Sequence, residues 1–225
     1  MFSNTLLVEG ADDLYAIAEL MGYYTHWPDV KKEAPVQIHD MKGVDNISRD
    51  RVSTFMKAPK LRNIGVVVDA DDNLLGRWNS LSGIFSEWFP NIPNELPEYG
   101  LICQNDDGLR LGIWIMPNNI SSGMLETFLA TLVPEPDNNP LWQYVGSAAN
   151  DARYNHSATY KETHSDKAKI HTWLAWQDPP GDAFGTAILK KVLNPSAKSA
   201  DTFATWFLNL FQLSKLQTSP LLEPE

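Results

Sequence analysis

The chain of 225 residues contains very little cysteine and no long apolar run. Its single cysteine, Cys103, excludes a disulfide framework and a zinc site made of several cysteines. Apolar stretches extend to only five or six residues, too short for a membrane-spanning helix. The first residues show neither the basic start nor the apolar core of a secretory signal. We therefore expect a cytoplasmic protein that does not enter a membrane.

Basic residues are also scarce: 18 Lys and Arg stand against 28 Asp and Glu, for a formal net charge of -10. This balance argues against non-specific binding of nucleic acid through a basic surface. It does not exclude a metal-dependent site, because such sites are built from carboxylates. The hydrophobic share of 43% is ordinary for a globular chain, and the length suits one sizeable domain.

The few basic residues are concentrated in one segment, residues 31–62, whose local balance is +4. Two interpretations remain open: a solvated helix face, or a patch that contacts phosphates beside an acidic centre. Lys42, Arg49 and Arg51 are our candidates for contacts with a nucleic-acid backbone. The segment holds the basic residues Lys31, Lys32, Lys42, Arg49, Arg51, Lys57, Lys60 and Arg62, and the acidic residues Glu33, Asp40, Asp45 and Asp50.

The hydrophobic pattern predicts an α/β fold with a parallel-sheet core, helices on both faces and a mostly helical C-terminal region. A β-branched run at residues 64–68 is typical of a central strand buried on both faces. Asp106, Asp107 and Gly108 form a hairpin-type turn between two later strands. The expected strands are 6–8, 36–40, 64–68, 99–103 and 111–116, and the expected helices 12–21, 44–56, 77–89 and 121–132.

From residue 141 the chain reads as mostly helical, with breaks at Pro179-Pro180-Gly181 and at Pro195. We expect a core over residues 1–135, a helical part completing the domain over 136–215, and a flexible tail over 216–225. A strongly apolar helix face near the C-terminus either caps the core or forms a homodimer interface. That face consists of Phe203, Trp206, Phe207, Leu210 and Phe211.

Two predicted strands end in carboxylates. Glu9 follows the first strand with Asp13 one helical turn later, and Asp69 and Asp71 follow the third. Because functional groups collect at the carboxyl ends of parallel strands, these acids are expected to meet. Their repulsion is tolerable with bound divalent cations, and oxygen ligands favour Mg²⁺ or Mn²⁺. The alternative is that the acids cap helices and form turns, which suits Asp12 and Asp72 but not Glu9, a poor cap that is costly to bury alone.

These segments resemble the Toprim domain. Leu-Leu-Val-Glu-Gly-Ala-Asp-Asp, followed by Val-Val-Val-Asp-Ala-Asp-Asp-Asn, matches its pattern of a strand ending in Glu-Gly and a strand ending in Asp-x-Asp. Topoisomerases, bacterial primases, small ribonucleases and nucleases of the "overcoming lysogenization defect" (OLD) class share this domain. Residues 5–213 also resemble a Toprim-like bacterial family of unassigned function, through segments that include Arg77-Trp78, 112–119, 123–126 and 169–176.

The resemblance implies a role for each acid. Glu9 would be a metal ligand or general acid/base, Asp69 and Asp71 would hold Mg²⁺, and Asp13 would help to bind a second metal. A later acid and a lysine complete the OLD-class site, and Glu126 and Lys169 are the expected residues. The alternatives are a favourable position of Glu126 near a helix N-terminus and a solvated position of Lys169.

The resulting hypothesis is an Mg²⁺-dependent nuclease that cleaves DNA or RNA by a two-metal mechanism. Two alternatives stay open: a non-catalytic module that binds metal or phosphate for a partner protein, and a phosphatase or nucleotidyl transferase acting on small substrates. The net charge favours the alternatives, and the carboxylate and lysine set favours the nuclease. No P-loop motif is present, so an ATPase like the one joined to OLD-class nucleases would be a separate chain, and the resemblance suggests a phage-defence system as its setting.

Overall fold

The computed structural model describes residues 3–28 and 30–216. Residues 217–225, which hold most of the expected tail, lie outside the described part. The strands are β1 (Asn4–Val8), β2 (Gln37–Asp40), β3 (Asn63–Asp69), β4 (Leu101–Gln104) and β5 (Arg110–Met116). The α-helices are α1 (Ala11–Tyr24), α2 (Arg49–Met56), α3 (Leu74–Phe85), α4 (Leu125–Ala130), α5 (Pro140–Asn155), α6 (Ser165–Ala175), α7 (Phe184–Leu189) and α8 (Lys198–Phe211). Short 3₁₀ turns are η1 (Lys31–Glu33), η2 (Val44–Asn46) and η3 (Glu162–His164).

The strands form one sheet in the order β2-β1-β3-β5-β4. β1 pairs in parallel with β2 and β3, β3 pairs in parallel with β5, and β4 is antiparallel to β5. The predicted α/β class with a mostly parallel sheet is confirmed. Because β1 and β3 are parallel neighbours, the loops that follow Val8 and Asp69 leave the same edge of the sheet.

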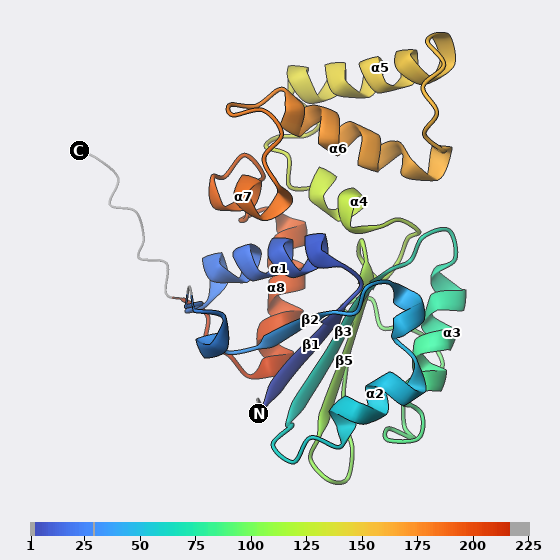
Figure 1. The fold of residues 1–225 in the computed structure, drawn as a ribbon, viewed down its shortest axis with the longest axis vertical. Helices are drawn as coiled ribbons and strands as arrows, with labels where there is room; N and C mark the ends of the chain where they lie inside the picture. Colours follow the sequence, from blue (N-terminus) through green and yellow to red (C-terminus); the bar gives the residue numbers. More distant parts are fainter. Residues whose placement is uncertain (1–2, 29, 217–225) are drawn as a thin grey trace, which may run out of the picture.

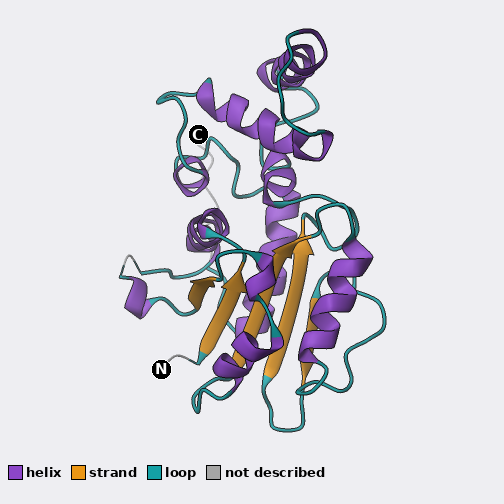
Figure 2. Cartoon of the chain, turned by 45° about the vertical axis from the view of Figure 1, so that its right-hand side comes forward, coloured by secondary structure: helices purple, strands orange, loops and turns teal. Residues whose placement is uncertain are grey.

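Helices cover both faces of the sheet, with α1 and α8 on one face and α2 and α3 on the other (Figure 1). Figure 2 shows the same layers after a turn of the molecule. Side chains alternate between the faces with the period of a strand. In β1, Leu6 and Val8 join the core beneath α1 and α8, whereas Leu7 joins the core beneath α2 and α3. Burial on both faces explains the continuous apolar run of β3.

The aromatic face of α8 is buried and caps the core. Leu210 of α8 lies so close to the sheet that a Cβ added at Gly112 would come within 2.4 Å of it, and one added at Gly65 within 3.0 Å. Phe203 and Phe207 are 0% exposed. Of the two interpretations of this helix face, the structure therefore shows the first, the capping of the core.

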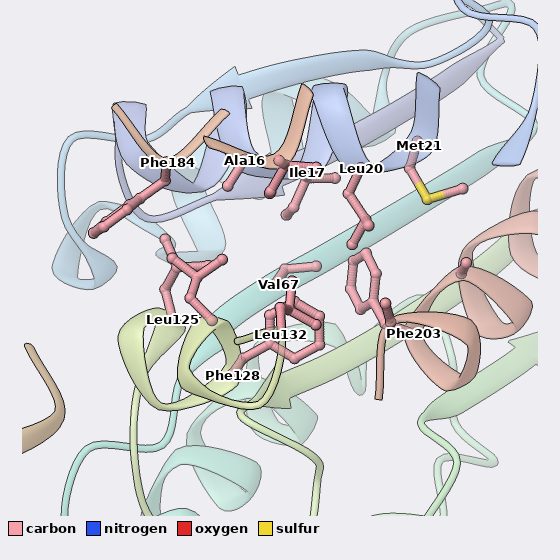
Figure 3. Packing of buried hydrophobic residues seen from close by; sticks show 14 of the residues in the cluster. Ala16, Ile17, Leu20, Met21, Val67, Leu125, Phe128, Leu132, Phe184 and Phe203 are labelled. Carbon is pink, nitrogen blue, oxygen red and sulfur yellow. The ribbon is translucent and has the colours of Figure 1, made fainter. Parts of the chain in front are cut away.

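A second layer of contacts places α4 beside α1. Ile17 and Leu20 of α1 face Leu125 and Phe128 of α4, with Phe184 of α7 at the end of the cluster (Figure 3). This packing sets the first turns of α1 and α4 beside the carboxyl ends of β1 and β3. Above them, α5 and α6 form a helical arm (Figure 1).

Three predicted helices have wrong boundaries. In the segment 44–56, the backbone leaves the helical conformation at Ile47 and Ser48, and Ile47 enters the core at 3% exposure, so that α2 begins at Arg49. The segment 77–89 contains α3, which starts earlier because the side chain of Asn73 accepts a hydrogen bond from the N–H of Gly76 and caps it. The third, at 121–132, is the shorter α4, because the chain before it pairs with another loop.

The helical last third and its breaks are confirmed, since 179–181 lies between α6 and α7 and Pro195 lies between α7 and α8. Within the described residues, no helix is long and apolar enough to cross a membrane.

Candidate metal centre

A cleft of about 620 Å³ lies at the carboxyl ends of β1 and β3. The first turns of α1 and α4 form part of its lining, and η3 and α6 contribute His164 and Lys167. Carboxylates dominate its polar lining: Glu9, Asp13, Asp69, Asp71 and Glu126 all border it. The structure thus brings together every acid that the sequence predicted as a ligand or acid/base.

Glu9 and Asp69 are joined directly. Oε1 of Glu9 accepts a hydrogen bond of 2.9 Å from the backbone N–H of Asp69. Oδ1 of Asp69 in turn accepts one of 2.8 Å from the backbone N–H of Leu125, the first residue of α4. These two bonds connect β1, β3 and α4 at one point, so the position of each carboxylate depends on the other elements.

Asp13 is buried at 6% exposure in the first turn of α1. Its Oδ2 accepts a hydrogen bond of 3.1 Å from the N–H of Gly10. Its Oδ1 is buried and has no hydrogen-bond partner. Leaving a buried oxygen without a donor costs free energy, and a group that supplies a positive charge in the cleft would offset that cost.

Glu126 is also buried, at 4% exposure, and has a cationic partner. Nζ of Lys167 on α6 lies 2.6 Å from its Oε1. This contact raises the pKa of Lys167, chiefly through the hydrogen bond to Glu126. Lys169, the lysine expected from the sequence, instead lies 3.6 Å from Asp166 one turn earlier on the same helix and does not line the cleft.

Asp71 stands at the outer edge of the cleft, with 56% of its side chain exposed. Its φ of 50° is left-handed, and its backbone exchanges two hydrogen bonds of 2.9 Å with Gly123, whose φ of 139° suits glycine. Arg77 donates from Nη2 to Oδ2 of Asp71 and from Nε to the carbonyl of Asp69, both at 2.8 Å. Arg77 therefore holds the Asp-x-Asp loop.

Burial and repulsion between acids raise the pKa values of Glu9, Asp13 and Asp69 and so favour their protonated forms. Burial, followed by the charges of Asp13, Glu9 and Glu126, raises the pKa of Asp69 to about 9. Burial and the charge of Glu9 raise the pKa of Asp13 to about 7. Burial also raises the pKa of Glu9, although the hydrogen bond from Asp69 opposes it. The cleft is therefore an environment in which an added cation is favourable.

The donor atoms are all oxygens, the ligand type that suits a hard divalent cation. Oxygen-only ligands are those that Mg²⁺ and Mn²⁺ prefer, and the unpartnered Oδ1 of Asp13 offers one. As the side chains stand in residues 3–28 and 30–216, no three His, Cys, Asp or Glu groups form a ready metal-binding cluster. Among the acids that line the cleft, Glu126 is in contact with the ammonium of Lys167.

The three residues predicted to contact phosphates lie in different places. Lys42 lines the cleft, and its ammonium pairs with Asp40. Arg49 donates to the carbonyl of Gly83 at 2.8 Å and lines a neighbouring hollow together with Arg77. Arg51 lies 3.5 Å from the carbonyl of Met41. Because Lys42 precedes α2, these cations are not one helix face: Lys42 lines the cleft, whereas Arg49 lines the neighbouring hollow.

Two residues that line the cleft, His164 and Lys167, and Arg77, which binds the Asp-x-Asp loop beside it, were not identified from the sequence. His164 and Lys167 come from a segment far in sequence from the acids that follow β1 and β3, and nothing in their spacing points to the cleft. Arg77 stood inside a noted motif, five residues after Asp72, but a lone arginine there has no signature of its contacts. Its position one helical turn after the acidic loop was the only available signal.

Comparison with known protein families places the chain in a defined group. Residues 3–212 match the model of a family described as protein of unknown function (DUF3226), so the chain belongs to that family. No curated protein and no solved structure matches the chain.

Proposed function

We propose that the protein is an Mg²⁺- or Mn²⁺-dependent phosphodiesterase of Toprim type that cleaves DNA or RNA. The observation that carries the proposal is the convergence of Glu9, Asp69, Asp13 and Glu126 from two adjacent parallel strands and two helices on one cleft, with Oδ1 of Asp13 buried and unpartnered. Buried structural carboxylates are normally paired with cations. In this set Glu126 is paired with Lys167, but Asp13 and Asp69 have no salt-bridge partner among the described residues, which points to a ligand that supplies positive charge.

We assign each residue a role from its position in the cleft. Asp13, Asp69 and Glu126, with Asp71 at the rim, are the groups that would hold cations, which would activate the attacking water and neutralise charge on the leaving oxygen. Glu9 is placed beside Asp69 as a ligand or general base. Lys167, rather than the expected Lys169, is the lysine able to donate to a phosphate oxygen in the cleft. Lys42 and Arg49 would contact neighbouring phosphates.

The test is cleavage of supercoiled plasmid, single-stranded DNA and total RNA with Mg²⁺ or Mn²⁺, beside EDTA controls. Wild type is compared with Glu9→Gln and Asp69→Asn. Asp106→Asn serves as a matched control, because this exposed acid lies in the β4–β5 turn at the other end of the sheet. We expect cation-dependent cleavage that both site variants reduce at least a hundredfold and the control leaves unchanged.

The outcomes separate the alternatives. Cleavage that survives both site substitutions would overturn the proposal. Cation binding without turnover of any polymer would favour the non-catalytic module, a reading supported by the engagement of Glu126 with Lys167. Hydrolysis of mononucleotides alone would favour the small-substrate enzyme. Adding an ATPase chain recovered with the protein tests whether activity depends on such a partner.

A further inference from the structure

One ion pair in the cleft joins two unlike environments. Glu126 is held at 5% side-chain exposure inside α4, whereas 48% of the side chain of Lys167 is exposed on α6. Their 2.6 Å contact therefore neutralises a buried carboxylate with a cation that reaches in from the solvent side. A buried carboxylate charge without such a partner is costly, so a cation at this position is favourable.

The same position cannot serve an ammonium and a divalent cation together. At 2.6 Å from Oε1, the ammonium of Lys167 occupies the space in which a metal ion would bind, and the two positive charges would repel each other. The other donors, Oδ1 of Asp13 and the carboxylate of Asp69, have no lysine or arginine salt-bridge partner in the described residues. The cleft thus offers one region open to a cation and one region already held by a lysine.

We infer that Lys167 controls a second cation position: it holds Glu126 in the substrate-free protein, and the phosphate of a bound nucleic acid draws its ammonium away, so that Glu126 becomes available to a second divalent ion only with substrate. The inference rests on the proposed function, since it assumes a phosphodiester in the cleft. Lys167 has the exposure and the four-carbon stem needed to move its ammonium from one anion to another without displacing α6.

The experiment counts Mn²⁺ ions per chain by titration calorimetry and by the electron paramagnetic resonance signal of free Mn²⁺. A phosphorothioate oligonucleotide serves as a slowly hydrolysed substrate. We expect wild type to bind one ion alone and two with the oligonucleotide. Lys167→Met should bind two ions in both conditions. Lys169→Met is the matched control on the same helix and should behave as wild type, because Lys169 pairs with Asp166.

A second variant tests the inference independently, in case Lys167→Met does not fold. Glu126→Gln removes the second position itself and should bind one ion whether or not the oligonucleotide is present, with circular dichroism confirming the fold. Two ions in substrate-free wild type, or one ion in well-folded Lys167→Met, would overturn the inference. Cleavage with an unchanging ion count would remove the inference alone, whereas the expected ion counts without any cleavage would remove the proposed nuclease activity.

Discussion

Oε1 of Glu9 accepts a 2.9 Å hydrogen bond from the backbone N–H of Asp69, and this bond joins the ends of two adjacent parallel strands. It uses the side chain of one strand end and the main chain of the next. Since the N–H of Asp69 is at the last position of β3, the bond completes the hydrogen bonding of that strand while it places a carboxylate in the cleft. Glu9 therefore contributes both to the stability of the sheet and to the carboxylates of the cleft.

These two contributions predict different results for two substitutions of Glu9. Glu9→Gln keeps an oxygen that can accept from Asp69, so the free energy of unfolding without metal should change little. Glu9→Ala leaves the N–H without this acceptor and should lower the free energy of unfolding by about 1 kcal/mol relative to Gln. Urea denaturation of both variants in EDTA measures the difference; equal stabilities would show that the bond contributes nothing.

The raised pKa values predict that the metal-free protein loses stability as pH rises. The pKa values of Asp13 and Asp69 are about 7 and about 9 in the folded chain, against about 4 in an unfolded one. The folded state therefore binds more protons, and the free energy of unfolding falls between pH 4 and pH 9. We expect a fall of at least about 1.4 kcal/mol, the equivalent of one pKa unit.

Denaturant titrations at pH 5, 7 and 9 in EDTA measure this fall, and parallel titrations in Mg²⁺ should show a smaller one. Asp106→Asn should follow the wild-type profile, because the substitution lies outside the cleft. A free energy of unfolding that rises over this range in EDTA would contradict the assigned pKa values.

Asp13→Asn should stabilise the metal-free protein at pH 8 and weaken cation binding. The substitution removes a buried charge that faces Glu9 and retains an oxygen able to accept from the N–H of Gly10. We expect a gain of about 1 kcal/mol in the free energy of unfolding and at least a tenfold loss of Mn²⁺ affinity. Denaturation and calorimetry test the two effects separately. A variant that is less stable at pH 8 and binds Mn²⁺ normally would remove Asp13 from the ligand set.

Lys42→Gln should weaken binding of nucleic acid without changing cation affinity. Lys42 stands at the edge of the cleft with 78% of its side chain exposed, so its contribution would be electrostatic and sensitive to salt. The slope of log affinity against log salt concentration should become smaller by about one. Lys60→Gln, in the loop before β3 at the far end of the sheet, is the control. Equal slopes for wild type and Lys42→Gln would exclude this contact.

Gly112→Ala should destabilise the fold without touching the cleft. The added methyl would meet Leu210 at 2.4 Å and force α8 away from the sheet, at a cost of about 1–3 kcal/mol. Gly83→Ala, whose added Cβ meets nothing within 4 Å, should instead be neutral or stabilising because alanine favours a helix. Thermal denaturation compares the two; a stable Gly112→Ala protein would mean that α8 can shift freely.

Local pattern was sufficient for the strands and for the acids that follow them. The β-branched run of β3 predicted a central strand buried on both faces, and the apolar run of β1 predicted a second strand. Parallel pairing then brought Glu9 and Asp69 together at one edge of the sheet. Helix boundaries were harder to predict from the sequence. For example, α4 starts at Leu125 only after Gly123 has paired with Asp71, a partner more than fifty residues away.

The choice between Lys167 and Lys169 shows most clearly what local sequence cannot predict. Two residues apart on an α-helix, their side chains point to nearly opposite sides, since each residue turns the helix by about 100°. Which side faces Glu126 depends on how α6 packs against α4 and α5, and no local pattern records that. The sequence by itself determined that acids follow β1 and β3, because the hydrophobic runs of those strands can be recognised locally. Only the tertiary structure decided which cation meets those acids, because that contact depends on the rotation of a distant helix.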